Sequence, residues 1–139
     1  MRNWTVASLA VFVLLAAATA EAHHAWNITF TEEKPVVIKG TLAKVDLVNP
    51  HSWFWVDAKN KDGSVTHWAI EGGPPNGLIR NGITKETLKL GEELTVYGYG
   101  ARDGSNQMAG VRYQRADGTE YGLANLGVEA VAKAKGNLK

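Results

Sequence analysis

Runs in which hydrophobic and polar residues alternate recur along the chain after residue 35, separated by turn signals. The first, residues 36–48, is rich in β-branched side chains and is interrupted by Gly40, which suggests a bend or bulge within a strand. Two further runs, 52–58 and 65–70, flank Lys61-Asp62-Gly63. These three residues suit a hairpin loop with glycine at its left-handed position. The pattern therefore predicts a long bent strand followed by a hairpin.

The register of this hairpin follows from its apolar residues. With residues 61–63 as the loop, Phe54 faces Ile70 and Val56 faces Trp68, so that one face is wholly apolar. The opposite face then pairs Asp57 with His67, Trp55 with Ala69, and Trp53 with Glu71. A slip of one residue would mix the two faces, so the pattern selects this register.

The second half of the chain adds a helical segment and two more strands. A loop at 72–77 precedes a short helical segment at 78–80, and alternation returns at 93–99 and 108–115. Five strands with a helical insert between the third and fourth predict an all-β (mainly β) fold, namely a small OB-fold-like barrel. A small β-sandwich is the alternative.

The first 22 residues have the parts of an export signal. Arg2 provides a positive start, residues 6–15 are apolar, and small residues permit cleavage after Ala22 or after Ala20. The apolar run is shorter than the roughly 20 residues that span a bilayer. We therefore expect a periplasmic or secreted protein with no membrane span after cleavage. The expected organisation is a signal peptide at 1–22, a barrel at 23–121 and a weakly helical tail at 122–139.

Composition excludes several classes of protein. The chain has no cysteine, so it has no disulfide, zinc thiolate or lipid-bearing cysteine at the cleavage site. Its formal net charge of +1 argues against a nucleic-acid partner, which usually requires a basic excess. We find no nucleophile elbow, phosphate loop or carboxylate dyad, and we expect the protein not to be an enzyme.

Histidines form the best set of candidate metal ligands. His23 and His24 lie at or near the new amino terminus, where the amine and imidazole nitrogens suit copper, nickel or zinc. In the predicted register Glu71 lies diagonally across from His51. If the N-terminal segment folds back, His23, His24, His51 and Glu71 converge on one ion, with copper as the first candidate. The alternatives are a solvated N-terminal tail and a structural role for His51 at the turn. His67, opposite Asp57, is expected to form a surface pair.

Aromatic residues offer a second candidate site. Trp53 and Trp55 share the polar face of the hairpin, and Tyr97 and Tyr99 of a later strand extend it. Such a surface would bind a small molecule, peptide or glycan. The alternative is that a terminal segment covers the tryptophans, with Trp26 and Phe30 as the covering residues.

Several segments together resemble one protein family. They are His23-His24-Ala25-Trp26, Asn49-Pro50-His51, Trp68-Ala69-Ile70-Glu71, Leu78-Ile79-Arg80-Asn81-Gly82 and Gly91-Glu92-Glu93-Leu94-Thr95-Val96. In this order they resemble the exported bacterial proteins of the DUF6152 family, whose function is unknown. The likeness extends from His23 to about Gly118. It implies export and a small barrel-like β-domain, and it brings no catalytic residue.

Overall fold

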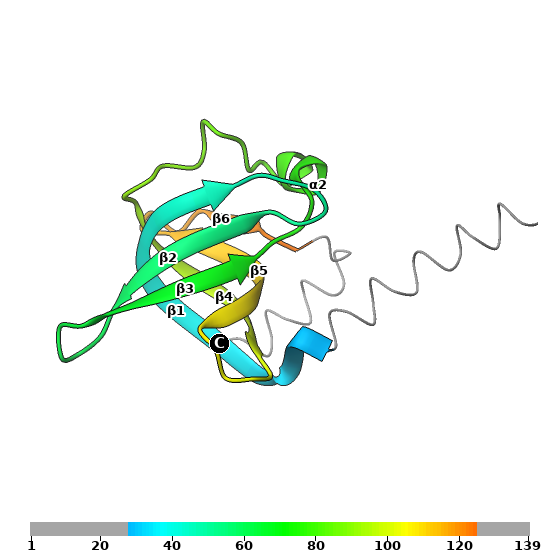
Figure 1. Ribbon diagram of the computed structural model, residues 1–139. Helices are drawn as coiled ribbons and strands as arrows, with labels where there is room; N and C mark the ends of the chain where they lie inside the picture. The colour runs from blue at the N-terminus through cyan, green and yellow to red at the C-terminus, as the bar shows by residue number, and fades with distance from the viewer. Residues whose placement is uncertain (1–27, 125–139) are drawn as a thin grey trace, which may run out of the picture.

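The computed structural model describes residues 28–124, which form one six-stranded sheet and one short helix (Figure 1). The elements in chain order are β1 (Phe30–Asp46), β2 (Trp53–Lys59), β3 (Val65–Glu71), α2 (Pro75–Arg80), β4 (Glu93–Ala101), β5 (Gln107–Arg115) and β6 (Glu120–Gly122). The strand order is β3-β2-β1-β4-β5-β6. The prediction of a mainly β fold with a short helical insert between the third and fourth strands is confirmed.

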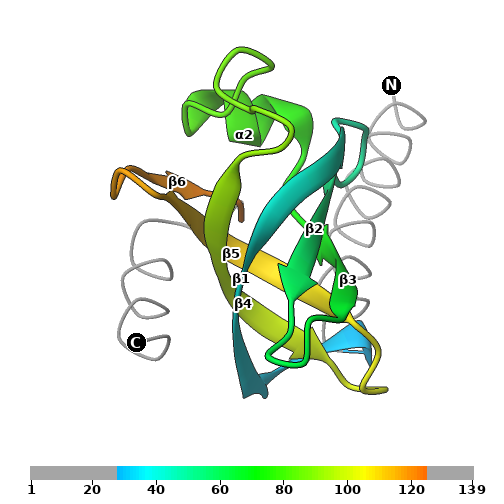
Figure 2. The ribbon, with the colours of Figure 1, turned by 90° about the vertical axis from the view of Figure 1, so that its left-hand side faces the viewer.

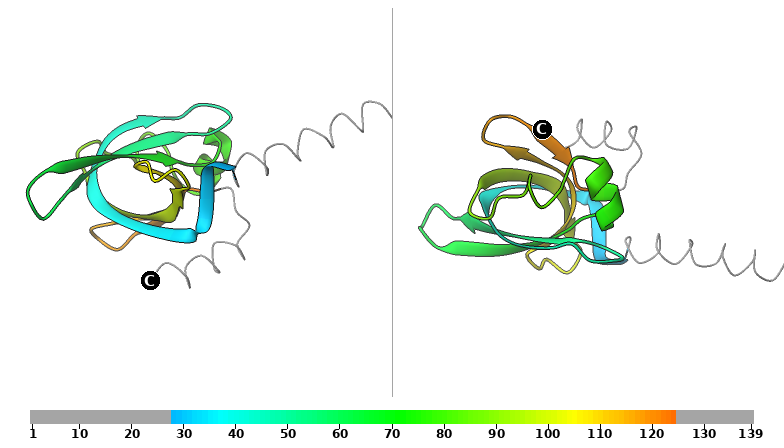
Figure 3. Two further views of the ribbon diagram at one scale, coloured as in Figure 1. Left: turned by 60° about the horizontal axis from the view of Figure 1, so that its bottom comes forward. Right: turned by 90° about the horizontal axis from the view of Figure 1, so that it is seen from above.

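A further pairing closes five of the strands into a ring. Neighbouring strands pair antiparallel, whereas β3 also pairs in parallel with β5 over Ala69–Glu71 and Gln107–Ala109. Figures 2 and 3 show how strongly β1 curves, so that it pairs with β4 between Phe30 and Thr41 and with β2 between Thr41 and Asp46. The sixth strand lies on the outer side of β5, beyond the ring.

The irregularity expected around Gly40 is present in β1. A Cβ atom at Gly40 would lie 2.5 Å from the carbonyl oxygen of Asp57, so the close approach of β2 requires glycine there. The register between β1 and β2 then shifts between Leu42 and Lys44. These features mark the place where β1 leaves β4 and follows β2.

Two of the strands differ from those that the sequence suggested. The first strand begins at Phe30 rather than near residue 36, because Phe30 pairs with Ala101 although polar residues follow it. The sixth strand was not predicted, since Glu120–Gly122 is too short to show alternation. An ion pair between Arg112 Nη1 and Glu120 Oε1 at 2.8 Å helps to hold this strand on β5.

One cluster of buried side chains fills the ring. Its members come from the five ring strands, from the segment after β3 and from the residue after β6: Ile38, Leu42, Phe54, Val56, Ile70, Leu78, Ile83, Leu94, Val96, Met108, Tyr113 and Leu123. The helix lies at the end of the molecule opposite the β2–β3 turn (Figures 1 and 2). The two ends of the hairpin therefore have different surroundings.

The hairpin has the predicted register throughout. Phe54 pairs with Ile70 and Val56 with Trp68, and on the other face Trp53 pairs with Glu71, Trp55 with Ala69, and Asp57 with His67. Its turn contains Gly63 in the left-handed conformation, with φ of 87°. Asp62 Oδ1 accepts a hydrogen bond from the Ser64 hydroxyl at 2.6 Å, and this bond lowers the pKa of the Asp62 carboxyl. The turn is therefore held by its own side chains.

Candidate functional site

A histidine–carboxylate pair lies near the end of the hairpin that is closer to α2. His51 lies two residues before the start of β2, and its Nδ1 contacts Oε1 of Glu71, the last residue of β3. The His51 side chain is 50% exposed, whereas that of Glu71 is only 18% exposed. The predicted diagonal neighbours are therefore in contact, with the carboxylate largely shielded and the imidazole open to solvent.

Backbone hydrogen bonds fix the positions of both members of this pair. Ser52, next to His51, donates its N–H to the carbonyl of Gly73 at 3.1 Å. Its own carbonyl accepts the N–H of Gly72, next to Glu71, at 2.8 Å. His51 and Glu71 are thus the direct neighbours of two residues, Ser52 and Gly72, that are hydrogen-bonded to each other.

A second histidine–carboxylate pair lies nearer the hairpin turn. His67 Nδ1 is 2.7 Å from Asp57 Oδ1, and the side chains are 76% and 38% exposed. This is the surface pair that the sequence predicted. It has the same chemistry as the first pair on the same face of the hairpin.

The two tryptophans lie between the pairs and remain partly exposed. The ring centroids of Trp53 and Trp55 are 6.4 Å apart, and their planes are inclined by 32°. Lys44 Nζ lies 4.3 Å from the ring centroid of Trp55 and 2.6 Å from Asp46 Oδ2. Lys44 and Asp46 were not among the predicted site residues. Their cross-strand pairing with Trp55 and Trp53 depends on the register shift in β1, which the sequence does not reveal.

Tyr97 and Tyr99 do not join the tryptophans. They belong to β4, which β1 separates from β2. The guanidinium carbon of Arg112 lies 3.4 Å from the ring centroid of Tyr97. Tyr99 is only 7% exposed and packs with Val111. The four aromatic residues that the sequence grouped thus occupy two separate places.

The predicted ligands His23 and His24, together with Trp26, lie outside the described residues. The described chain nevertheless shows where the N-terminal segment joins the ring. Phe30 is 1% exposed and packs with Ala101 and Ala109, and Ala109 is the partner of Glu71 in the parallel pairing. The start of β1 is therefore one strand away from the His51–Glu71 pair.

Within residues 28–124, no group of three or more histidine, aspartate or glutamate side chains is arranged to hold a metal ion. The His51–Glu71 pair provides one imidazole and one carboxylate. A complete metal site at this place requires further ligands from elsewhere in the chain.

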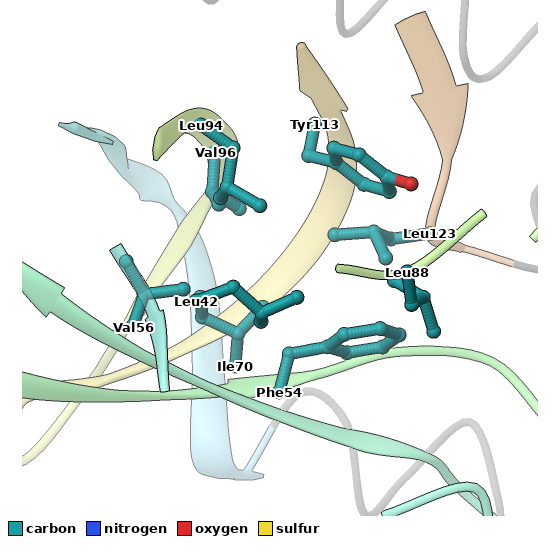
Figure 4. Close-up of a pocket in the computed structure, with 9 residues that line it drawn as sticks. All are labelled: Leu42, Phe54, Val56, Ile70, Leu88, Leu94, Val96, Tyr113 and Leu123. Carbon is teal, nitrogen blue, oxygen red and sulfur yellow. The ribbon is translucent and has the colours of Figure 1, made fainter. Parts of the chain in front are cut away.

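A small apolar hollow in the core is a poor alternative site. It is lined by Leu42, Phe54, Val56, Ile70, Leu88, Leu94, Val96, Tyr113 and Leu123 (Figure 4). The only side-chain polar atom among them is the Tyr113 hydroxyl, which has no hydrogen-bond partner among the described residues. Burial raises the pKa of this hydroxyl and keeps it neutral. We interpret the hollow as imperfect packing of the core, since this one hydroxyl is the only side-chain polar group in its lining and ligand sites usually combine several.

Comparison with known protein families gives one match. The model of a family of unknown function, DUF6152, matches residues 10–112, which is more than half of the chain. The chain belongs to the DUF6152 family. The match includes His23, His24 and both histidine–carboxylate pairs of this DUF6152 member. No curated protein matches the chain. In the described part of this DUF6152 protein, no helix is both long and apolar enough to cross a membrane.

Proposed function

We propose that this protein is an exported OB-fold-like barrel that binds a transition metal ion through His51 together with His23 and His24. Copper is the first candidate for this ion. Export through a cleaved signal at 1–22 would deliver the protein to the periplasm or the outside of the cell. The ring order supports the barrel assignment, because one long strand pairs with two neighbours and β3 closes on β5. This arrangement is typical of five-stranded barrels of that type.

The observation that carries the proposal is the position of His51. Its imidazole is half exposed, and in the described part of the chain only its Nδ1 has a partner. Metal-bound histidines usually donate their second ring N–H to a carboxylate or a carbonyl group. The His51–Glu71 pair provides such a carboxylate at Nδ1.

Chain length permits the N-terminal histidines to reach this place. His24 precedes Phe30 by six residues, which corresponds to at most about 20 Å of extended chain. Phe30 packs on Ala109, and neighbouring strands are about 4.8 Å apart, so Ala109 lies close to Glu71. His23 and His24 are therefore within reach of His51 in either cleavage product.

The donor set decides which ions fit. Imidazole nitrogens and an amino-terminal nitrogen are borderline-soft donors that suit copper(II), nickel(II) and zinc. Copper(II) binds such nitrogens most tightly among the divalent first-row ions. Cleavage after Ala22 would place the free amine on His23, whereas cleavage after Ala20 would place His23 third.

Copper(II) titration of the exported protein, with its amino terminus defined by sequencing, tests the proposal. We expect nitrogen ligation in the electron paramagnetic resonance spectrum and an affinity that falls on the order of 100-fold in His51→Ala and His23→Ala, because each variant lacks a ligand. His67→Ala is the matched control, since it removes an imidazole of the same hairpin face and should leave the affinity unchanged. Equal binding by wild type, His51→Ala and His67→Ala would refute the proposal.

A second candidate function rests on the partly exposed indoles of Trp53 and Trp55, with Lys44 above the latter. A planar or sugar ligand could stack on this pair, while the ammonium group would favour one that carries negative charge. Titration with acidic saccharides or peptides, followed by tryptophan fluorescence, tests it. A response that is lost in Trp55→Leu and unaffected by a metal chelator would favour this function over metal binding.

A further inference from the structure

We propose that Glu71 is a positioning residue, which fixes the tautomer and the orientation of the His51 ring so that Nε2 is the atom presented to a ligand. The presentation of a metal ion rests on the proposed function. The tautomer is a property of the metal-free chain and can be measured by itself.

The contact between the two side chains determines the tautomer. An ionised carboxylate can only accept hydrogen bonds, and Nδ1 is the ring nitrogen of His51 that contacts Glu71 Oε1, so we expect Nδ1 to carry the proton of the neutral ring. In a neutral imidazole with the proton on Nδ1, Nε2 has the free electron pair. The lone pair that binds metals is therefore on the nitrogen that points away from Glu71.

The backbone holds Glu71 in a position that permits this role. Its strand pairs with β2 at Trp53 and with β5 at Ala109, so that Glu71 lies between two neighbouring strands. On the other side of the contact, the hydrogen bonds of Ser52 with Gly72 and Gly73 fix the backbone next to His51. Neither side chain must move to form the pair.

The geometry gives Glu71 a different role from that of a metal ligand. An ion at Nε2 would lie on the far side of the imidazole ring from the carboxylate, in the order carboxylate–histidine–metal. In that order the carboxylate increases the basicity of the ligating nitrogen, and its removal typically weakens metal binding by about 10–100-fold.

Nitrogen-15 NMR of the histidine rings in the metal-free protein, under mildly alkaline conditions in which imidazole is neutral, is the first test. We expect the Nδ1–H tautomer for His51 in the wild type and in Glu71→Gln, whose amide oxygen still accepts the bond. In Glu71→Ala we expect the Nε2–H form to become populated. Asp57→Ala, which removes the carboxylate of the other pair, should leave the His51 signals unchanged. An Nε2–H tautomer of His51 in the wild type would overturn the inference.

Copper(II) binding by the same variants is the second test. We expect Glu71→Ala to bind copper(II) about 10–100-fold more weakly than wild type while keeping the same ligand atoms in its spectrum. Glu71→Gln should lie between them, and Asp57→Ala should match wild type. Loss of an oxygen ligand in Glu71→Ala would overturn the inference, because Glu71 would then bind the ion directly.

The two tests separate this inference from the proposed function. In one outcome, His51 is the Nδ1–H tautomer only when residue 71 can accept its hydrogen bond, but His51→Ala binds copper(II) as well as wild type. The metal function then fails and the positioning by Glu71 stands. If copper(II) binding depends on His51 but not on residue 71, the inference fails and the metal function stands.

Discussion

The two histidine–carboxylate pairs of the β2–β3 hairpin share their chemistry and differ in their surroundings. In both, a histidine Nδ1 contacts a carboxylate on the same outer face. Glu71 is 18% exposed, whereas Asp57 is 38% exposed and its partner His67 is 76% exposed. A histidine and a carboxylate thus form a partly shielded pair in one place and a solvated surface pair in the other.

The reason lies in the strands that flank each pair. At Glu71, β3 has a neighbour on each side, because β5 joins it over Ala69–Glu71. At His67, β3 pairs with β2 alone in the described part of the chain. A strand with a neighbour on each side leaves its side chains less freedom to move and less contact with water. The lower exposure to water strengthens an electrostatic contact.

The largest effect is expected where the start of β1 packs near the Glu71 end. Phe30→Ala removes a ring that is 1% exposed and packs with Ala101 and Ala109, so the free energy of unfolding should fall by about 3 kcal/mol in urea denaturation. Ile28→Ala, at a side chain that is 73% exposed, should change it by less than about 0.5 kcal/mol. Equal effects of the two substitutions would mean that Phe30 does not anchor this end.

A smaller loss is expected from a substitution that displaces β5 beside Glu71. A Cβ atom at Gly98 would lie 2.1 Å from the carbonyl oxygen of Ala109, so Gly98→Ala should reduce stability by about 2 kcal/mol. It should also increase the mobility of the His51 ring more than that of the His67 ring, as NMR relaxation would detect. Gly100→Ala is the control on the same strand, since its nearest contact is a flexible Val36 methyl at 3.1 Å. If both rings respond equally, the flanking strand does not explain the difference between the pairs.

Double-mutant cycles compare the pairs directly. Replacement of His51 and Glu71 by alanine, singly and together, should give a coupling free energy of up to about 1 kcal/mol. The same cycle on His67 and Asp57 should give a clearly smaller value, because that pair is more exposed and more strongly screened. Thermal and urea unfolding provide both measurements. A larger coupling for the exposed pair would reverse the comparison.

The smallest effect is expected at Ser52, beside His51. Its hydroxyl oxygen is buried and has no hydrogen-bond partner among the described residues, so Ser52→Ala should change stability by less than about 0.5 kcal/mol, or raise it slightly. Ser64→Ala, near the other end of the hairpin, should destabilise more, because that hydroxyl donates to Asp62 at 2.6 Å. A marked loss of stability in Ser52→Ala would indicate that this hydroxyl has a partner at the His51 end.

The sequence predicted the hairpin well for a specific reason. With residues 61–63 as the loop, Phe54, Val56 and Ile70 lie on the same face, and this register also brings His51 near Glu71. Local alternation and a glycine in the loop are sufficient to fix such a unit. The grouping of Tyr97 with the tryptophans did not follow in this way, because it depends on which strand lies between β2 and β4.

The sequence by itself determined the β-rich fold, the hairpin register and the diagonal placement of His51 and Glu71, since each depends on residues close in the chain or on a period of two. Only the tertiary structure decided that β5 flanks Glu71 but not His67, that β1 separates the aromatic residues, and that Phe30 places the start of β1 one strand away from Glu71. These features arise from pairings between distant segments. Many distant pairings are compatible with one alternating pattern, and the packing of the whole core selects among them.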